Sequence, residues 1–164
     1  MARLVGAAVG VMQAGDSLRK AVASDEPAIR DCAALAYARY VPLIGRKPAP
    51  MLADFPAQIA AGEVHVAVDG AGALLGFIVY RPEGGHMLLE NVAVMPGAAG
   101  RGIGKALIAR CEAAARQLGL GSVQLYTNEK MVENLSIYPR LGYAETDRRT
   151  EDGFNRVYFQ KPLT

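Results

Sequence analysis

A glycine-dense turn between two apolar segments constrains this sequence more than any other feature. An apolar run that predicts a strand ends at Met95, and an amphipathic segment that predicts a helix continues to Leu118. The turn between them contains Gly97, Gly100, Gly102 and Gly104. Glycines let consecutive backbone N–H groups converge, and a helix N-terminus adds partial positive charge. Because Arg101 and Lys105 add full charges, the turn predicts a binding site for a small ligand that carries phosphate.

Two common phosphate-binding motifs do not fit the spacing of this turn. A P-loop requires G-x-x-x-x-G-K-[ST], yet Ala99 occupies its first glycine position and Ala106 its Ser/Thr position. A dinucleotide-binding fingerprint requires G-x-G-x-x-G, yet its last position holds Lys105 or Leu107, depending on the glycine pair that begins the count. The spacing that remains is x-x-x-G-x-G over residues 99–104, with hydrophobic segments on both sides.

This spacing resembles the coenzyme A loop of the GCN5-related N-acetyltransferase (GNAT) superfamily, which reads Q/R-x-x-G-x-G/A between a strand and a helix. Here the loop is Ala99-Gly100-Arg101-Gly102-Ile103-Gly104. Ala99 departs from the usual Gln or Arg, which removes a side-chain contact but leaves the backbone cradle. The segment LYTNEKMVENLSIYPRLGY also resembles the family, with Asn134, Tyr138 and the ending Leu141-Gly142-Tyr143. The resemblance extends over nearly the whole chain, from about residue 17 to residue 163.

The resemblance implies an α/β fold (α+β, with a mixed sheet) in one domain. The expected sheet is central, mostly antiparallel, splayed at its fourth strand and flanked by helices. A chain of 164 residues, half of them apolar, suits one domain with a proper core. We expect residues 17–164 to form the acetyltransferase domain and residues 1–16 to form a flexible N-terminal extension; a signal peptide is the alternative for these first residues.

Periodicity and turn residues predict the elements. The predicted strands are residues 17–24, 63–68, 74–80, 87–94, 122–127 and two strands within 148–162 around a turn at 151–153. The predicted helices begin at residue 25 and end before Pro42, then cover 51–61, the segment from the glycine loop to Leu118, and 132–141. We expect the first helix to bury Ile29, Leu35, Ala36 and Tyr40.

Composition excludes several classes of function. A net charge of +2 is too small to indicate nucleic-acid binding, and no apolar stretch is long enough to span a membrane. Cys32 and Cys111 lie far apart in helical segments, so we interpret them as buried free thiols in a reducing compartment, with a disulfide as the alternative. Two histidines and two cysteines form no metal-ligand cluster. These features predict a cytoplasmic protein.

The resemblance implies an enzyme that moves the acetyl group of acetyl-CoA directly to a primary amine of a small molecule or peptide. Backbone groups of Val92, Ala93 and Val94 are then expected beside the pantetheine arm and the thioester. The pyrophosphate is expected on the N–H groups from Gly100 to Lys105. A covalent intermediate is not expected, because neither cysteine lies in an activating motif. Alternatives are a non-catalytic acyl-CoA-binding sensor, a nucleotide-binding domain and an O-acetyltransferase.

Two side chains are the candidate catalytic groups. By resemblance Tyr138 is the general acid that protonates the departing thiolate, and Asn134, one helical turn earlier, contacts the pantetheine. The alternatives are that Tyr138 only packs and that Asn134 caps its helix. Glu90 lies in the apolar strand MLLENVAV and is the candidate base; its alternatives are a solvent-facing residue or an ion-pair partner of an arginine. His65, expected to face solvent, and His86, in a turn, are weaker candidates for the base.

Acceptor specificity is expected from the segments on either side of the splayed strands. These segments contain Tyr37, Tyr40, Arg46, Lys47 and Met51, and at the other end Tyr126, Arg148, Arg149 and Phe154. The basic side chains favour an anionic acceptor, whereas Glu129 and Glu133 favour a cationic amine, and solvated surface charge is the alternative for each. A homodimer through the C-terminal strands, with the apolar run Val157-Tyr158-Phe159, is a further hypothesis.

Overall fold

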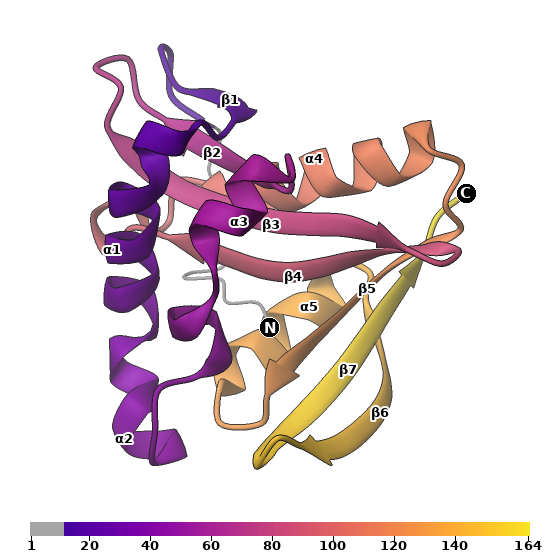
Figure 1. Ribbon diagram of the computed structural model, residues 1–164. Helices are drawn as coiled ribbons and strands as arrows, with labels where there is room; N and C mark the ends of the chain where they lie inside the picture. Colours follow the sequence, from indigo (N-terminus) through magenta and orange to yellow (C-terminus); the bar gives the residue numbers. More distant parts are fainter. Residues whose placement is uncertain (1–11) are drawn as a thin grey trace.

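A single seven-stranded mixed sheet organises the chain in our computed structural model, which describes residues 12–164 (Figure 1). The spatial order is β1-β2-β3-β4-β5-β7-β6. The strands are β1 Ser17–Lys20, β2 Val64–Val68, β3 Leu74–Glu83, β4 His86–Val94, β5 Ser122–Asn128, β6 Ala144–Glu151 and β7 Phe154–Pro162. All neighbouring pairs are antiparallel except β4 and β5, which are parallel. The predicted mixed, mostly antiparallel sheet is confirmed.

Helices cover both faces of this sheet. They are α1 Glu26–Tyr37, α2 Val41–Ile44, α3 Phe55–Ala60, α4 Ile103–Gln117 and α5 Val132–Arg140. Helices α1 and α3 pack on one face and bury a core that includes Phe55 and Phe77. Helices α4 and α5 lie on the other face over a second core that includes Leu107 and Tyr138 (Figure 1). The sheet therefore separates two cores.

The parallel contact between β4 and β5 is short. It is limited to the pairs Met87↔Val123 and Leu88↔Gln124, after which the two strands diverge. On the other side of β4, the register with β3 shifts between the pairs Tyr80↔Leu89 and Val79↔Asn91, so Glu90 is the extra residue of a β-bulge. A bulge bends its strand and increases its twist. The predicted splay at the fourth strand is confirmed, and the bulge that accompanies it lies at Glu90 itself.

Some predicted boundaries differ for identifiable local reasons. Strand β1 ends at Lys20, because Asp25 pairs with Arg19 at 2.7 Å and accepts a 2.8 Å hydrogen bond from the N–H of Val22, which stabilises a 3-10 turn. The helix predicted for residues 51–61 begins only at Phe55, where the Asp54 side chain caps the N-terminus. A 3-10 turn, Ala49–Leu52, precedes it.

The expected core of the first helix is correct except at one position. Ile29, Ala36 and Tyr40 are buried, but Leu35 is 55% exposed, so the prediction for Leu35 was wrong. Cys32 and Ala33 occupy the inward face instead. Cys32 and Cys111 are both buried and not joined in a disulfide, as predicted. No helix within residues 12–164 has the length and hydropathy needed to cross a bilayer.

The predicted N-terminal extension lies mostly outside the described residues, which begin at residue 12. Its last residues form a turn, in which the N–H of Gln13 donates a 2.9 Å hydrogen bond to the carboxylate of Asp16. Asp16 in turn forms an ion pair with Arg101 of the glycine loop at 2.6 Å. The segment just before β1 is therefore attached to the loop that precedes α4.

Candidate functional site

The glycine loop has the backbone conformation of an anion cradle. Gly100 and Gly102 have φ angles of 80° and 76°, in the left-handed region that L side chains rarely adopt. Gly102 is also the N-cap of α4, a helix of 15 residues whose first N–H groups have no intrahelical partner. Left-handed residues before a helix N-terminus turn successive N–H groups toward one point, and the helix dipole favours negative charge there. The loop therefore fits a pyrophosphate.

The two cations of the loop are placed differently. Lys105 is exposed in the first turn of α4. Arg101 is paired with Asp16, whose side chain is only 3% exposed. The Nε atom of Arg101 is buried and has no hydrogen-bond partner among the described residues. Ala99 is extended, and Ile103 and Gly104 are buried in the first turn of the helix. The structure thus keeps the predicted loop together but holds Arg101 by an ion pair within the protein.

Strand β4 presents alternate backbone groups to the gap beside β5. The N–H of Met95 donates a 2.8 Å hydrogen bond to Leu75 on the β3 side. Because backbone groups alternate along an antiparallel strand, those of Ala93 also face β3, whereas those of Val92 and Val94 point toward β5. Of the three residues expected beside the thioester, Val92 and Val94 therefore offer backbone groups to the gap, and Ala93 does not.

Tyr138 and Asn134 lie one turn apart on the buried face of α5, and both are 0% exposed. The Tyr138 ring packs against Tyr143 and Phe159, with centroid distances of 5.8 and 5.7 Å. Its hydroxyl has no hydrogen-bond partner, and burial raises its pKa well above the usual value of a phenol. Asn134 lies inside the helix and donates a 3.0 Å hydrogen bond to Thr127 Oγ1, so it does not cap α5.

Glu90 lies at a small pocket on the α1/α3 side of the sheet. The pocket has a volume of about 170 Å³ and is lined by Ala49, Pro50, Ala53, Gln58, Glu90, Asn91 and Tyr126. The Glu90 carboxylate accepts a 2.7 Å hydrogen bond from Arg81 Nη1 and another from Gln58 Nε2. Glu90 is therefore the ion-pair partner of an arginine, which is one of the alternatives that the sequence left open, and it also lines the pocket.

A second, larger hollow adjoins this pocket and shares Tyr126 with it. Its volume is about 460 Å³, and it is lined by Glu83, His86, Leu88, Gln124, Leu125, Tyr126, Thr146, Asp147, Arg149, Tyr158 and Gln160. Behind the Tyr126 ring lies the Arg156 guanidinium, 4.5 Å from the ring centroid. Tyr126 lines both hollows, and we call the two together the acceptor groove.

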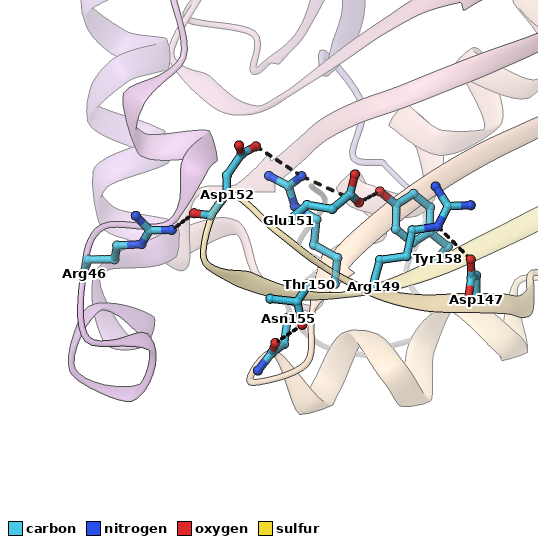
Figure 2. A network of polar contacts seen from close by, with 9 residues as sticks. Arg46, Asp147, Arg149, Thr150, Glu151, Asp152, Asn155 and Tyr158 are labelled. Carbon is cyan, nitrogen blue, oxygen red and sulfur yellow. Dashed lines mark hydrogen bonds and ion pairs between the residues drawn. The ribbon is translucent and has the colours of Figure 1, made fainter.

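The β6–β7 hairpin supports the Tyr126 side of the acceptor groove. Arg156 pairs with Glu151 and Asp152, with N–O distances of 3.9 and 3.7 Å. Arg46, from the loop after α2, donates a hydrogen bond to the backbone carbonyl of Asp152, and its guanidinium lies 3.7 Å from the Phe154 ring centroid. Figure 2 shows Arg46 bound to Asp152 at the tip of the hairpin. It also shows Glu151, the residue before the tip, bound to the hydroxyl of Tyr158 on β7. These contacts join the α2 loop to the hairpin beside the groove.

Sequence reasoning missed Gln58 and Arg81, the two side chains that hold Glu90. Their hydrogen bonds to Glu90 join residues 32 and 9 positions apart in the chain. Neither residue belongs to a motif, so no local pattern could identify it. Arg81 carries one available signal, because it is a charged residue in the apolar strand that faces Glu90 across a hairpin.

The two histidines occupy different positions from those expected. His65 is 7% exposed and stacks on Tyr80 with a centroid distance of 4.9 Å, so the expectation of a solvent-facing side chain was wrong. Burial, with the nearby charges of Arg110 and Lys20, lowers the pKa of His65 to about 4. His86 begins β4 instead of lying in a turn, and it lines the larger hollow.

The candidate specificity residues divide into groove walls and surface pairs. Tyr126 and Arg149 line the acceptor groove, whereas Arg148 pairs with Glu145 on the exposed face of β6. Tyr37 and Tyr40 are buried. The Glu133 carboxylate accepts hydrogen bonds from Arg39 and Tyr40, and the Glu129 carboxylate accepts one from Asn155. Lys47 is exposed and Met51 is partly buried.

Two of the three residues in the apolar run proposed for dimerisation are buried. Val157 and Phe159 are 1% and 3% exposed and belong to the core beneath α4 and α5. The edge of the sheet is β6, whose residues are mostly exposed, and β7 is an interior strand. Val157 and Phe159 therefore do not support the dimer hypothesis, which stays a prediction. Within residues 12–164 no group of three His, Cys, Asp or Glu side chains is placed to hold a metal ion.

Comparison with known proteins places this geometry in one family. The chain is 38% identical over 88 residues to a mycothiol acetyltransferase from Pseudarthrobacter chlorophenolicus, a match that covers 50% of this chain and 27% of that protein. It is 31% identical over 87 residues to the streptothricin acetyltransferase of Streptomyces lavendulae, which covers 52% of this chain and 46% of that protein. The chain thus spans less than half the length of either relative.

Solved structures show the same fold. The PaiA N-acetyltransferase from Thermoplasma acidophilum, crystallised in complex with coenzyme A, superimposes with a TM-score of 0.75 over 90% of this chain and 99% of that chain, at 16% identity. The model of the acetyltransferase (GNAT) family matches residues 29–143, which include β2 to β5, the glycine loop and Tyr138. The chain belongs to the acetyltransferase (GNAT) family.

Proposed function

We propose that this chain transfers the acetyl group of acetyl-CoA directly to a primary amine of a small molecule or peptide. The divergence of β4 from β5 beyond Leu88 carries the proposal, because it opens the sheet beside the outward-facing backbone groups of Val92 and Val94. The relatives named as acetyltransferases support it, as does the loop with left-handed Gly100 and Gly102. Bound acetyl-CoA would supply an activated thioester at this opening.

The two substrates approach from opposite faces of the sheet in this proposal. The small pocket with Glu90 lies on the α1/α3 side, and the buried Tyr138 lies on the α4/α5 side. In this proposal the amine and the thioester meet between the two sides, where β4 diverges from β5 beyond Leu88. Holding both reactants in one orientation removes most of the entropic cost of their encounter.

Glu90 is the proposed base. A primary amine reaches the pocket as an ammonium ion and must lose a proton before it can attack a carbonyl carbon. The Glu90 carboxylate lines the pocket and is oriented by Arg81 and Gln58, and in this proposal it accepts that proton directly or through a water molecule.

Tyr138 is the proposed acid. Its hydroxyl is buried and has no hydrogen-bond partner, which leaves its proton available to a group that enters the gap. The phenol of an ordinary tyrosine, with a pKa of about 10, is a weaker acid than a thiol, with a pKa of about 8.5, so transfer of its proton to a thiolate requires close contact and exclusion of solvent. Complete burial between Tyr143 and Phe159 provides that exclusion.

A ligand-binding experiment followed by an activity assay tests the proposal. Thermal unfolding is measured with acetyl-CoA, coenzyme A and ATP, because a ligand that binds only the folded state raises its stability. Both coenzyme A forms should raise the melting temperature and ATP should not. Release of free thiol in the presence of a panel of primary amines then measures turnover. Stabilisation by coenzyme A without thiol release from any amine would reduce the chain to an acyl-CoA-binding domain, and no stabilisation would contradict the proposal altogether.

A further inference from the structure

The small pocket is lined by two side-chain amides, each of which has a buried atom without a hydrogen-bond partner among the described residues. Gln58 Oε1 and Asn91 Nδ2 both lack a partner, and Asn91 is 1% exposed. Gln58 Nε2 donates to the Glu90 carboxylate, which leaves Oε1 as its unpaired acceptor. Asn91 Oδ1 accepts a 2.7 Å hydrogen bond from the Tyr37 hydroxyl, which leaves Nδ2 as its unpaired donor. Because buried polar groups are normally paired, these two atoms indicate a ligand that supplies both partners.

We infer, on the basis of the acetyl transfer proposed above, that the acceptor is an aminoacyl amide: a primary amine whose neighbouring carbon bears a neutral carbonyl group. The amine donates to Gln58 Oε1 and lies beside Glu90. The carbonyl oxygen accepts from Asn91 Nδ2. A simple alkylamine supplies no acceptor for Asn91, and a free carboxylate would place negative charge beside the Glu90 carboxylate.

The dimensions of the acceptor groove agree with this class of acceptor. A pocket of about 170 Å³ is close to the size of an engineered cavity of about 150 Å³ that holds one benzene molecule. It therefore has room for an amine, its carbon, a carbonyl group and a small side chain against Ala49, Pro50 and Ala53. The larger hollow of about 460 Å³ continues past Tyr126 and is mainly polar, so the rest of the acceptor is a polar body.

Two small ligands isolate the contribution of the carbonyl group. Alaninamide and isopropylamine share the amine and the methyl group, but only alaninamide has a carbonyl oxygen. Binding of each is measured by titration into the protein saturated with coenzyme A, so that no acetyl transfer is needed. The ¹H–¹⁵N signal of the Asn91 side-chain amide, assigned by its loss in Asn91→Asp, should move with alaninamide and stay with isopropylamine. Equal dissociation constants, an Asn91 signal that does not move, or tighter binding of alanine than of alaninamide would overturn the inference.

Variants then test whether Asn91 provides the discrimination. The ratio of kcat/KM for alaninamide to kcat/KM for isopropylamine should fall about tenfold in Asn91→Leu and in the isosteric Asn91→Asp, because each loses the buried donor. Gln58→Leu is the matched control: it removes a contact to the amine that both ligands share, so both kcat/KM values should fall together. An unchanged ratio in both Asn91 variants would contradict the inference. Preferential binding of alaninamide without thiol release from any amine would instead contradict only the proposed acetyl transfer.

Discussion

The hydroxyl of Tyr37 on α1 donates a 2.7 Å hydrogen bond to Oδ1 of Asn91 on β4, immediately after the bulge at Glu90. The same hydroxyl lies 3.1 Å from the carbonyl oxygen of Val92, and both side chains are buried. Val92 is one of the two residues whose backbone groups face the gap beside β5. A helix near the start of the domain therefore fixes the edge of the strand at which the two proposed substrates meet.

Tyr37→Phe should lower the free energy of unfolding by about 1–3 kcal/mol, because it leaves buried acceptors on Asn91 and Val92 without their donor. Urea unfolding measures the change. Tyr158→Phe is the matched control, because it removes a hydroxyl that bonds to Glu151 on the partly exposed hairpin. The control should cost less, and equal losses in the two variants would show that the Tyr37 contact is not special.

Tyr138→Phe should lower kcat by about 10²- to 10⁴-fold if the hydroxyl is the proton donor. The dissociation constant of coenzyme A should change little, since the ring contacts with Tyr143 and Phe159 remain. Thiol release measures kcat, and calorimetric titration with coenzyme A measures binding. Because the hydroxyl has no partner within the protein, the variant should also keep the stability of the wild type. Unchanged turnover would remove the acid role and leave Tyr138 as a packing residue.

Glu90→Gln should lower kcat/KM for amines by about 10²-fold or more, because the amide cannot accept the ammonium proton. Raising the pH should recover part of the loss, since a larger fraction of the amine is then already neutral. Glu26→Gln, which removes a partly buried carboxylate paired with Arg30 on α1, serves as the control for the same chemical change. A Glu90→Gln enzyme with the wild-type pH profile would assign proton removal to water.

Much of the fold could be predicted because its signals are local. The glycine turn, the period-2 strands and the Asp152–Gly153 hairpin turn, with φ angles of 53° and 78°, are each specified by a few adjacent residues. The splay was predicted in another way, from the resemblance of the strand before the glycine loop to the family. The short β4–β5 pairing confirms it.

The burial of His65 and Leu35 was predicted wrongly because it depends on which other elements pack on each face of their strand or helix. Local sequence patterns do not contain that information. His65 alternates with valines, which is typical of a strand with one face in solvent, but α4 covers its other face and buries it. Leu35 matched a helical stripe, yet the inward face of α1 is carried by smaller residues, Cys32 and Ala33. The polar contacts of Glu90 were likewise invisible, because Gln58 and Arg81 reach it from two other elements.

Gly102→Ala should weaken coenzyme A binding and destabilise the fold by about 1 kcal/mol, because alanine is strained at a φ of 76°. Gly97→Ala is a control in the same loop: its φ is not in the left-handed region, and an added Cβ would meet no atom within 4 Å. Thermal unfolding with and without coenzyme A separates the two effects. Equal behaviour of the two variants would show that the left-handed residue before α4 does not shape the cradle.

The buried His65 should make the protein less stable in acid. Its pKa is about 4 in the folded state, against about 6.5 in an unfolded chain. Between these values the unfolded chain binds the proton and the folded chain does not, so stability falls as the pH drops from about 6.5 to about 4, by up to about 1.4 kcal/mol per pH unit. His65→Phe keeps the stacking on Tyr80 but cannot be protonated. Urea unfolding across this range should therefore give a shallower pH dependence for the variant, and parallel curves for the two proteins would contradict the assignment.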